Sequence, residues 1–389
     1  MELKKGYKQT EVGVIPSDWG TNKIKNLAQI TTGSKNTQDR IESGEYPFFV
    51  RSQTVERINS FSFDGEAILT AGDGVGTGKV FHYINGKFDF HQRVYKISDF
   101  KEKIDGYYLF LYFSNHFYNR IMQMTAKSSV DSVRMEMIAD MQIPLPPTKA
   151  EQTAIATALS DVDALIQSLE KLIAKKRNIK QGAMQKLLKP RKGWVGKKLG
   201  AIGIFKKGKG IKKDEVSTEG YPCIRYGELY THHDEYIKLF NSFINEQTAK
   251  ASQRINKGDI LFAGSGETKE EIGKCAALVD ELIAYAGGDL IILTPIDCDS
   301  MFLGFLLNHS MVAKQKAQKA QGDAVVHIYP SSLSEISIHL PPKSEQTRIA
   351  TILSDIDAEI SALETKLAKY KQVKQGMMQE LLTGKTRLV

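Results

Sequence analysis

Three charged side chains in the second half of the chain have the spacing of a metal-dependent nuclease site. They are Asp259, Glu267 and Lys269, in the D…ExK order in which carboxylates hold Mg²⁺ and a lysine supports the nucleophile. No proline precedes the aspartate, and residues 65–77 of the first half offer no equivalent set. Because 25% of all residues are charged, chance explains this spacing better than a site does. A stand-alone Mg²⁺-dependent nuclease is therefore kept only as the alternative hypothesis.

A glycine-rich segment over residues 71–79 suggests phosphate binding. It fails the P-loop pattern, because Asp73 stands where the first glycine should be and Val80 where Ser or Thr should be. It also fails the G-x-G-x-x-G pattern, because Thr77 occupies the third glycine position. The segment is therefore predicted to be a turn between two strands. Its last residue, Lys79, is still placed to approach a DNA phosphate.

Histidine and cysteine residues do not form a pattern that binds metal. His232 and His233 have no partners at metal-ligand spacing, so we expect a solvated pair. Cys223, Cys275 and Cys298 lack the CxxC spacing of zinc sites or a disulfide framework, which favours a reducing cytosol. The chain also lacks an Asn/Asp-Pro-Pro-Tyr motif for amino-methyl transfer and an obvious Ser/His/Asp set. We predict a non-catalytic chain with no metal or cofactor of its own.

An internal repeat is the strongest signal in the sequence. Residues 151–188 recur as 345–382, with roughly 23 of 38 positions identical, and a Leu-Pro-Pro precedes each copy. Upstream, Trp19 matches Trp194 at an offset of 175, and Gly65 matches Gly258 at an offset of 193. One insertion of 18 residues therefore lies between Pro222 and Gly258. The remainder of the two halves runs nearly in register.

Each copy of the repeat is predicted to be one long helix, because apolar residues recur at three- and four-residue steps. In the first copy the stripe breaks at Lys176 and Lys180, and Ile179, Ala183 and Leu187 are expected to resume it. We expect the two helices to pack as an antiparallel coiled coil of roughly 57 Å, although a plain helical hairpin within a larger domain fits the periodicity equally well. The predicted packing residues are Ile155, Leu159, Val162, Ile166 and Leu169, with Ile349, Leu353, Ile356, Ile360, Leu363 and Leu367.

The segments before the helices are predicted to be mixed α/β domains. In the first, strands are expected at 46–51, 67–70, 78–83, 93–97 and 141–144, with a helix at 106–124. In the second, strands are expected at 221–226, 259–263, 290–294 and 336–339, with a helix at 300–320. The fold class is α+β: two such domains (1–148 and 192–342) separated by two long helices (149–191 and 343–389) in a pseudo-twofold repeat.

Composition fits this organisation. The 389 residues are 41% apolar with a formal net charge of +8, typical of a globular protein of two or three domains. Residues 149–191 and 343–389 hold seven of the eight net positive charges, so the domains are almost neutral. The polar N-terminus has no apolar signal core and no apolar run is long enough to span a bilayer, so a cytoplasmic protein is expected.

The motifs around the repeat carry a resemblance. The chain has Leu340-Pro341-Pro342-Lys343-Ser344-Glu345-Gln346 before the second helix and Leu381-Leu382-Thr383-Gly384-Lys385 after it. It opens with Gly6-Tyr7-Lys8-Gln9-Thr10-Glu11-Val12-Gly13-Val14-Ile15-Pro16. Over essentially its whole length it resembles the DNA-specificity subunit of type I restriction–modification systems. It departs from the pattern in the first copy, where one extra residue separates Leu-Pro-Pro from Glu-Gln.

The resemblance implies a non-catalytic subunit that binds double-stranded DNA. Each domain would be a target-recognition domain reading one half of a bipartite site. The paired helices would set the gap and dock two modification (methyltransferase) subunits, with restriction subunits joining them. These partners, not this chain, would use S-adenosylmethionine, ATP and Mg²⁺. A helical scaffold that binds only protein is the other alternative.

The DNA-contacting residues are predicted from residue type and position, since phosphate and base contacts favour Lys and Arg on loops. Arg51 and Arg225 follow the two Tyr-Pro strands and are expected in equivalent places. The insertion after Pro222 is predicted to help set the second half-site. The predicted DNA-binding residues are Arg51, Lys79, Lys127, Arg134, Lys206, Lys207, Lys209, Arg225 and Lys269.

Overall fold

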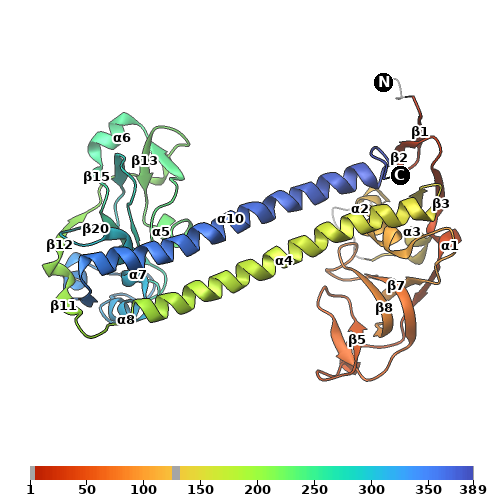
Figure 1. Cartoon of the computed structure of the whole chain (residues 1–389), viewed down its shortest axis with the longest axis horizontal. Helices are drawn as coiled ribbons and strands as arrows, with labels where there is room; N and C mark the ends of the chain where they lie inside the picture. Colours follow the sequence, from red (N-terminus) through yellow and green to blue (C-terminus); the bar gives the residue numbers. More distant parts are fainter. Residues whose placement is uncertain (1–4, 125–131, 389) are drawn as a thin grey trace. The chain divides into compact units, whose positions relative to one another are not determined.

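The chain folds into two compact units that each contain parts of both long helices. The structure is a computed structural model that describes residues 5–124 and 132–388. Unit 1 comprises residues 1–170 with 365–389, and unit 2 comprises residues 171–364. The helices α4 (Lys149–Leu187) and α10 (Lys343–Leu381) are each unbroken, as predicted (Figure 1). Each unit therefore joins one α/β domain to about half of each helix. No helix in the described ranges is long and apolar enough to cross a lipid bilayer.

Unit 1 is built on a six-stranded sheet in the order β4-β9-β7-β8-β5-β6. All neighbours are antiparallel except β5 and β8. The central strand β7 is buried from Ala67 to Ala71, which is why this stretch is apolar without alternation. The strands are β4 (Gln29–Thr32), β5 (Tyr46–Phe49), β6 (Glu56–Ile58), β7 (Phe63–Ala71), β8 (Phe81–Phe90) and β9 (Val94–Ser98).

The helix α2 (Gly106–Met124) forms the core of unit 1 with this sheet, and its predicted bounds are confirmed. Ile68 and Ile97 of the sheet share one apolar cluster with Leu109, Phe113 and Phe117 of α2. Smaller elements close the unit. They are β1 (Tyr7–Thr10), β2 (Gly13–Pro16), β3 (Gly20–Lys23), α1 (Ile24–Leu27), η1 (Thr37–Asp39), α3 (Met135–Ala139) and β10 (Gln142–Leu145), of which β1 pairs with β2 and β3 with β10.

Unit 2 repeats this plan with its strands divided between two four-stranded sheets, β12-β20-β16-β18 and β14-β13-β19-β15. Two short pairs, β11 with β22 and β17 with β21, complete it. The strands are β11 (Val195–Lys198), β12 (Gly203–Lys207), β13 (Tyr221–Ile224), β14 (Ser242–Ile244), β15 (Gln253–Ile255), β16 (Ile260–Ala263), β17 (Ser265–Gly266), β18 (Cys275–Ala277), β19 (Ala284–Ala286), β20 (Leu290–Pro295), β21 (Val326–His327) and β22 (Ser337–Leu340).

The helix predicted over 300–320 is in fact two helices, α7 (Ser300–Asn308) and α8 (Ser310–Gln318). His309 separates them because its backbone is extended, at φ −65° and ψ 144°. The residue ends α7, and its ring accepts a hydrogen bond from the Met311 amide at the start of α8. The other helices of unit 2 are η2 (Leu199–Ala201), η3 (Lys213–Glu215), α5 (Glu228–Thr231), α6 (Glu246–Ala251) and α9 (Pro330–Ser334).

The repeated Gln-Thr residues fasten each long helix to its own domain. In unit 1, Gln152 Oε1 accepts a hydrogen bond from the Asp105 amide at 2.9 Å, and Thr153 Oγ1 donates to Asp105 Oδ2 at 2.9 Å. The other Asp105 oxygen accepts from the Tyr108 amide in the first turn of α2. Gln152 also donates to the carbonyls of Lys103 and Pro146. We call this set of contacts the Gln–Thr lock.

Unit 2 contains the same lock. Gln346 Oε1 accepts from the Asp299 amide at 3.0 Å, and Thr347 Oγ1 donates to Asp299 Oδ2 at 2.8 Å. Asp299 caps α7 by accepting from the Phe302 amide, and Gln346 donates to the Pro341 carbonyl. Gln152 and Gln346 are both buried, so these amides have little access to water. The extra residue before Glu151 therefore leaves the lock unchanged.

Within each unit the two long helices run antiparallel and are joined by equivalent ion pairs. In unit 1, Lys374 Nζ lies 2.6 Å from Asp163 Oδ1, and Lys371 Nζ lies 2.8 Å from Glu170 Oε1. In unit 2 the residues 194 positions away repeat them. These pairs are Lys180 with Asp357, at 2.8 Å, and Arg177 with Glu364, at 2.6 Å.

The break in the apolar stripe of α4 is explained by these pairs. Lys176 and Lys180 can occupy positions in the stripe because their ammonium groups form ion pairs with the carboxylates of Glu359 and Asp357 on α10. Ile179 is 46% exposed, so the prediction that it resumes the apolar seam is wrong. Among the predicted packing positions, the buried ones are Ile155, Leu159, Ile166, Leu169, Ile349, Leu353 and Ile360, and the half-buried ones are Val162, Ile356, Leu363 and Leu367.

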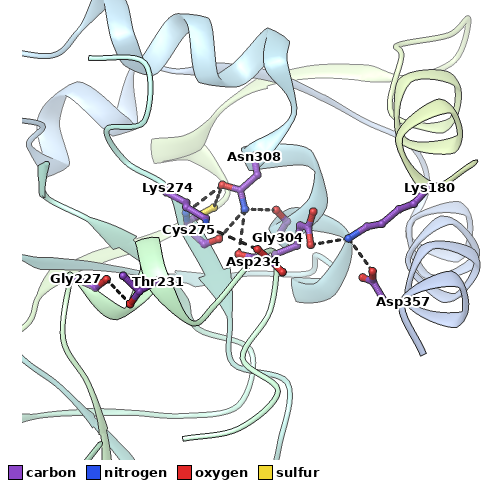
Figure 2. Close-up of polar contacts among 10 residues, drawn as sticks. Lys180, Gly227, Thr231, Asp234, Lys274, Cys275, Gly304, Asn308 and Asp357 are labelled. Carbon is purple, nitrogen blue, oxygen red and sulfur yellow. Dashed lines mark hydrogen bonds and ion pairs between the residues drawn. The ribbon is translucent and has the colours of Figure 1, made fainter. Parts of the chain in front are cut away.

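In unit 2 the pair Lys180–Asp357 gains a third member from the inserted segment. Lys180 Nζ also lies 3.0 Å from Glu235 Oε2 and 5.5 Å from the centre of the Phe305 ring. Figure 2 shows the lysine reaching from α4 toward Asp357, beside the contacts of Asn308 with Cys275. Burial alone would lower the pKa of Lys180, but the carboxylates of Glu235 and Asp357 together raise it above its ordinary value. The insertion is thereby tied to both long helices.

In unit 1 a further set of ion pairs is made by Arg387, which binds the carboxylates of Glu151 and Asp18. Its guanidinium makes a two-point contact with Glu151, whose side chain is fully buried, and lies 3.1 Å from Asp18 Oδ2. It also lies 5.8 Å from the Trp19 ring. Gly384 precedes it with φ of +70°, and a Cβ there would stand 2.6 Å from Pro16. The first and last described segments therefore fold together.

We expect Lys180→Ala to loosen unit 2 far more than Lys374→Ala loosens unit 1. The first change leaves Glu235 and Asp357 buried without a cation and should cost about 3–5 kcal/mol. The second breaks a pair whose side chains are 27% and 26% exposed, against 16% and 6% for Lys180 and Asp357, and should cost about 1 kcal/mol.

Hydrogen–deuterium exchange of the full chain measures this difference. Amides of residues 228–241 should exchange faster in Lys180→Ala and remain protected in Lys374→Ala. Equal protection of this segment in both variants would contradict the role assigned to Glu235.

Candidate nucleic-acid interface

Both units carry an equivalent glycine loop directly after a central strand. In unit 1 the Gly72 amide donates to the Arg93 carbonyl at 2.8 Å, and the Val133 amide donates to the Gly72 carbonyl at 2.7 Å. In unit 2 the Gly264 amide donates to the Asp289 carbonyl at 2.7 Å, and the Ile328 amide donates to the Gly264 carbonyl at 3.0 Å. We define the glycine loop as residues 72–80 in unit 1 and 264–274 in unit 2.

The position of each loop requires its first glycine. A Cβ on Gly72 would stand 3.0 Å from the Arg93 carbonyl oxygen, and a Cβ on Gly264 would stand 2.7 Å from the Asp289 carbonyl oxygen. Any side chain would therefore push the loop off the neighbouring strand. The turn predicted at residues 71–79 is confirmed, and its glycines serve close backbone packing.

In unit 1, cationic side chains surround the glycine loop. Arg51 Nη1 lies 2.9 Å from Asp73 Oδ1, and Arg93 Nη1 lies 3.6 Å from Asp73 Oδ2. Lys79 is exposed, with its ammonium 5.2 Å from the centre of the Tyr118 ring. One carboxylate thus faces two guanidiniums, and the net charge of the set is positive. Such a surface suits phosphate contacts.

Of the other residues predicted in unit 1, Arg134 belongs to the same region and Lys127 cannot be placed. Arg134 is exposed and directly follows Val133, whose amide bonds to the glycine loop. Lys127 lies outside the described residues. Arg93 was not predicted, because the pairing of its strand with the loop is a long-range contact that no local pattern shows.

In unit 2, two hollows flank the glycine loop. A small one of about 90 Å³ is lined by Lys207, Ser265, His327 and Tyr329, among others, and Ser265 Oγ lies 3.0 Å from His327 Nδ1. A larger one of about 520 Å³ shares Ser265. Its lining also includes Tyr226, Tyr230, Glu267, Glu271 and Val325. The second domain therefore presents a hollowed face at this position.

Three of the predicted cations in unit 2 lie at this face or on the strand beside it. Lys207 borders the smaller hollow, with its ammonium 6.0 Å from the centre of the Tyr329 ring. Lys269 lies on the glycine loop, 3.5 Å from Asp323 Oδ1. Lys206 precedes Lys207 on β12, so its side chain points to the opposite face of the strand. Lys209 is exposed beyond the strand end, and its amide donates to the Ala286 carbonyl.

The expected equivalence of Arg51 and Arg225 is wrong by one residue. The His91 amide donates to the Phe49 carbonyl in unit 1, and the Gly287 amide donates to the Ile224 carbonyl in unit 2. Phe49 therefore matches Ile224, and Arg51 matches Tyr226 rather than Arg225. Successive side chains of a strand alternate in direction, so Arg225 is half-buried while Tyr226 is exposed. The offset of 175 that relates Trp19 to Trp194 also relates Arg51 to Tyr226, so the tyrosine was missed because the prediction followed residue type rather than this register.

The nuclease set does not assemble. Asp259 is buried, where its carboxylate accepts hydrogen bonds from Thr294 Oγ1 at 2.6 Å and from the Asn256 amide at 2.8 Å. Glu267 and Lys269 are exposed on the glycine loop. Among the described residues, no group of three or more His, Cys, Asp or Glu side chains could hold a metal ion. The nuclease alternative has no support in this geometry.

The prediction of a solvated His232–His233 pair is half wrong. His232 is exposed, whereas His233 is buried 4.0 Å from Glu228 Oε2. Burial lowers the pKa of His233 to about 4. Glu228 is itself buried, which raises its pKa, and its other oxygen accepts from Ser242 Oγ. His233 is therefore neutral in the folded chain at neutral pH.

The described chain holds two copies of one domain, each bound to the long helices by the same contacts and each with a different loop face. The family model for the type I restriction modification DNA specificity domain matches residues 16–178 and 191–375. The chain belongs to this family and holds two copies of its domain.

Relatives and solved structures agree with this assignment. The type I restriction enzyme MjaVIII specificity subunit of Methanocaldococcus jannaschii is 25% identical, over 96% of this chain and 94% of the relative. The EcoDI specificity subunit of Escherichia coli is 32% identical over 40% of this chain and 34% of the relative. The S subunit structure from M. genitalium has the same fold, with a TM-score of 0.66 at 17% identity and 98% of both chains covered.

The buried histidine predicts acid sensitivity of unit 2. The folded-state pKa of about 4 lies below the unfolded value of about 6.5, so the unfolded chain binds the proton more readily. This contribution to stability is complete above pH 6.5 and is lost as pH falls toward 4. Its slope is at most about 1.4 kcal/mol per pH unit.

Urea unfolding at several pH values tests this expectation. His233→Asn should flatten the loss of stability between pH 6.5 and 4, and the neighbouring exposed control His232→Asn should not. An unchanged pH profile in His233→Asn would contradict the assignment.

Proposed function

We propose that this chain is the non-catalytic DNA-specificity subunit of a type I restriction–modification complex. Each domain reads one half of a bipartite double-stranded DNA site, and the paired helices set the gap. One observation carries the proposal: the contacts that join helix and domain are the same in both units, while the glycine-loop faces differ. The face of unit 1 carries Arg51 with Asp73, whereas the equivalent face of unit 2 carries Tyr226 with Ser265. Two domains that join the helices by the same contacts but present different glycine-loop faces suit two different half-sites.

The insertion of unit 2 supports this division of roles. Its helix α5 places Tyr230 so that the hydroxyl donates to the Ser265 carbonyl at 3.1 Å, next to the larger hollow. At its other end Glu235 bonds to Lys180 of α4. The insertion thus links the glycine loop to the helices, and we propose that it helps to set the second half-site.

The outer faces of the two long helices support docking of one kind of subunit twice. Gly182 and Gly376 occupy equivalent positions, and a Cβ on either would meet nothing within 4 Å. Glycine in the middle of a helix costs about 0.5–1 kcal/mol relative to alanine. Beside them stand Ile179 and Val373, equivalent apolar residues that are 46% and 40% exposed. A partner backbone that approaches closely would account for both features.

We therefore propose that two modification (methyltransferase) subunits bind these faces, with restriction subunits joining the complex. The partners would use S-adenosylmethionine, ATP and Mg²⁺, and this chain would bring none of them. A cytoplasmic location, in the compartment that holds the DNA, accompanies this proposal.

Mapping of methylated adenines tests the function. The chain co-expressed with its modification subunits should direct methylation to one bipartite motif, and omission of the chain should abolish the motif. The chain alone with Mg²⁺ and DNA should neither cleave nor methylate. Cleavage by the isolated chain, or the same motif without it, would overturn the proposal. A scaffold that binds only protein would add no sequence preference in a gel shift.

The helix glycines give a test of docking that does not depend on unfolding. Gly182→Gln and Gly376→Gln should stabilise the helices while their side chains block a close partner. We expect each single variant to bind one modification subunit fewer, measured by native mass spectrometry. The matched control is Ala164→Gln with Ala358→Gln, an equivalent pair of exposed helix positions. Full assembly in the double glycine variant would place the docking surface elsewhere.

A further inference from the structure

The glycine loops of the two units present equivalent tips with opposite chemistry. Val75 lies three residues after Gly72, and Glu267 lies three residues after Gly264. The two glycines are equivalent by their backbone hydrogen bonds, so the two tips are equivalent as well. The pairing of Asp73 with Ser132 and of Ser265 with His327 confirms the match on the other side of each loop.

The loop of unit 1 is built to present its valine. Val75 is the most exposed large apolar residue in the described chain, at 101% of the reference area. The loop is held from within, because the Thr77 amide donates to the Gly74 carbonyl at 3.0 Å and Thr77 Oγ1 donates to the same oxygen at 2.6 Å. A Cβ on Gly76 would stand 2.7 Å from the Arg51 carbonyl oxygen, so the loop packs against its neighbour. The valine therefore stands on a fixed turn.

The surroundings of Val75 suit nucleic acid. Arg51, Arg93 and Lys79 flank the tip with groups that can bind phosphates. An apolar side chain at the edge of such a face contacts the C5 methyl group of thymine in the major groove. The exposed valine is thus available for contact with a base.

The tip of unit 2 offers the opposite chemistry in the same place. Glu267 is exposed at the rim of the larger hollow, beside Tyr226 and Tyr230. Lys269, two residues further along, lies close to Asp323. A glutamate at the edge of a base accepts a hydrogen bond from the N4 amino group of cytosine.

We propose that the glycine-loop tip is the same reading position in both domains, and that Val75 contacts a thymine methyl while Glu267 accepts from a cytosine amino group. The proposal rests on the proposed function and names the residues that give the two half-sites different sequences. Each tip governs one base pair, in opposite halves of the bipartite motif.

The test uses the full complex with its modification subunits and a random-sequence DNA library. Val75→Glu should lower the preference for one base pair by about ten-fold or more in one half of the methylated motif. Glu267→Val should do the same in the other half. Val14→Glu and Glu281→Gln, exposed positions elsewhere in units 1 and 2, should leave the motif unchanged.

Further variants separate reading from folding. Val75→Ala and Glu267→Gln should assemble as the wild type, by native mass spectrometry, and relax only the same base pairs. An unchanged motif in both Val75→Glu and Glu267→Val would overturn the proposal, as would loss of assembly in Val75→Ala. If the wild-type complex gave no bipartite motif, the proposed function itself would fail, and that result is distinct from an unchanged motif.

Discussion

The Gln–Thr lock is the constraint on which the rest of each unit depends. One buried glutamine and one threonine of a long helix bind both the amide and the carboxylate of a helix-capping aspartate, Asp105 in unit 1 and Asp299 in unit 2. The same aspartate fixes the first turn of α2 or α7, so the direction of the long helix and that of the domain helix are set by one residue. This explains why Gln-Thr is repeated without change while the domains diverge. The repeat serves an intramolecular surface that occurs twice, in addition to any partner that binds twice.

Charge at the helix pairs adds a second constraint. In both units the helices are held by lysine or arginine on one helix and aspartate or glutamate on the other, at equivalent positions. Partly exposed pairs of this kind contribute little stability, but they specify antiparallel register because a shifted helix would bring like charges together. The contacts of Lys180 differ, since Glu235 comes from the insertion and its side chain is only 13% exposed. The longer domain is thereby coupled to the helices through a charge that the shorter domain does not use.

Much of this frame was predictable because its signals are local or repeated. The periodicity of Ile349, Leu353 and Ile360 predicts a helix, and a gapless repeat predicts a second copy of it. The break between α7 and α8 was missed because the apolar periodicity continues across it, although Asn308, His309 and Ser310 are weak helix formers, and the extended backbone of His309 divides the segment. The burial of His233 beside an exposed neighbour depends on packing between segments far apart in the chain, whereas the equivalence of Arg51 with Tyr226 follows from the 175-residue offset between the two halves. Lys79, Arg134 and Lys207, predicted from residue type alone, lie at or beside the glycine loops, but residue type could not show Arg93, Tyr226 or His327 near them.

The distribution of net charge follows the division between the long helices and the two domains. Seven of the eight net positive charges belong to the two helical segments, and this excess remains after every carboxylate of both segments has been counted. The domains are almost neutral, so their attraction for DNA cannot come from net charge. We propose that it comes from segregation, because Arg51, Arg93 and Lys79 share one loop face and Asp73 fixes the two guanidiniums without neutralising the set. A nearly neutral domain with a small positive face binds nonspecific DNA weakly, because few counterions are released. Discrimination between sequences then depends more on base contacts such as those of the loop tips, and this is the property that a specificity subunit requires.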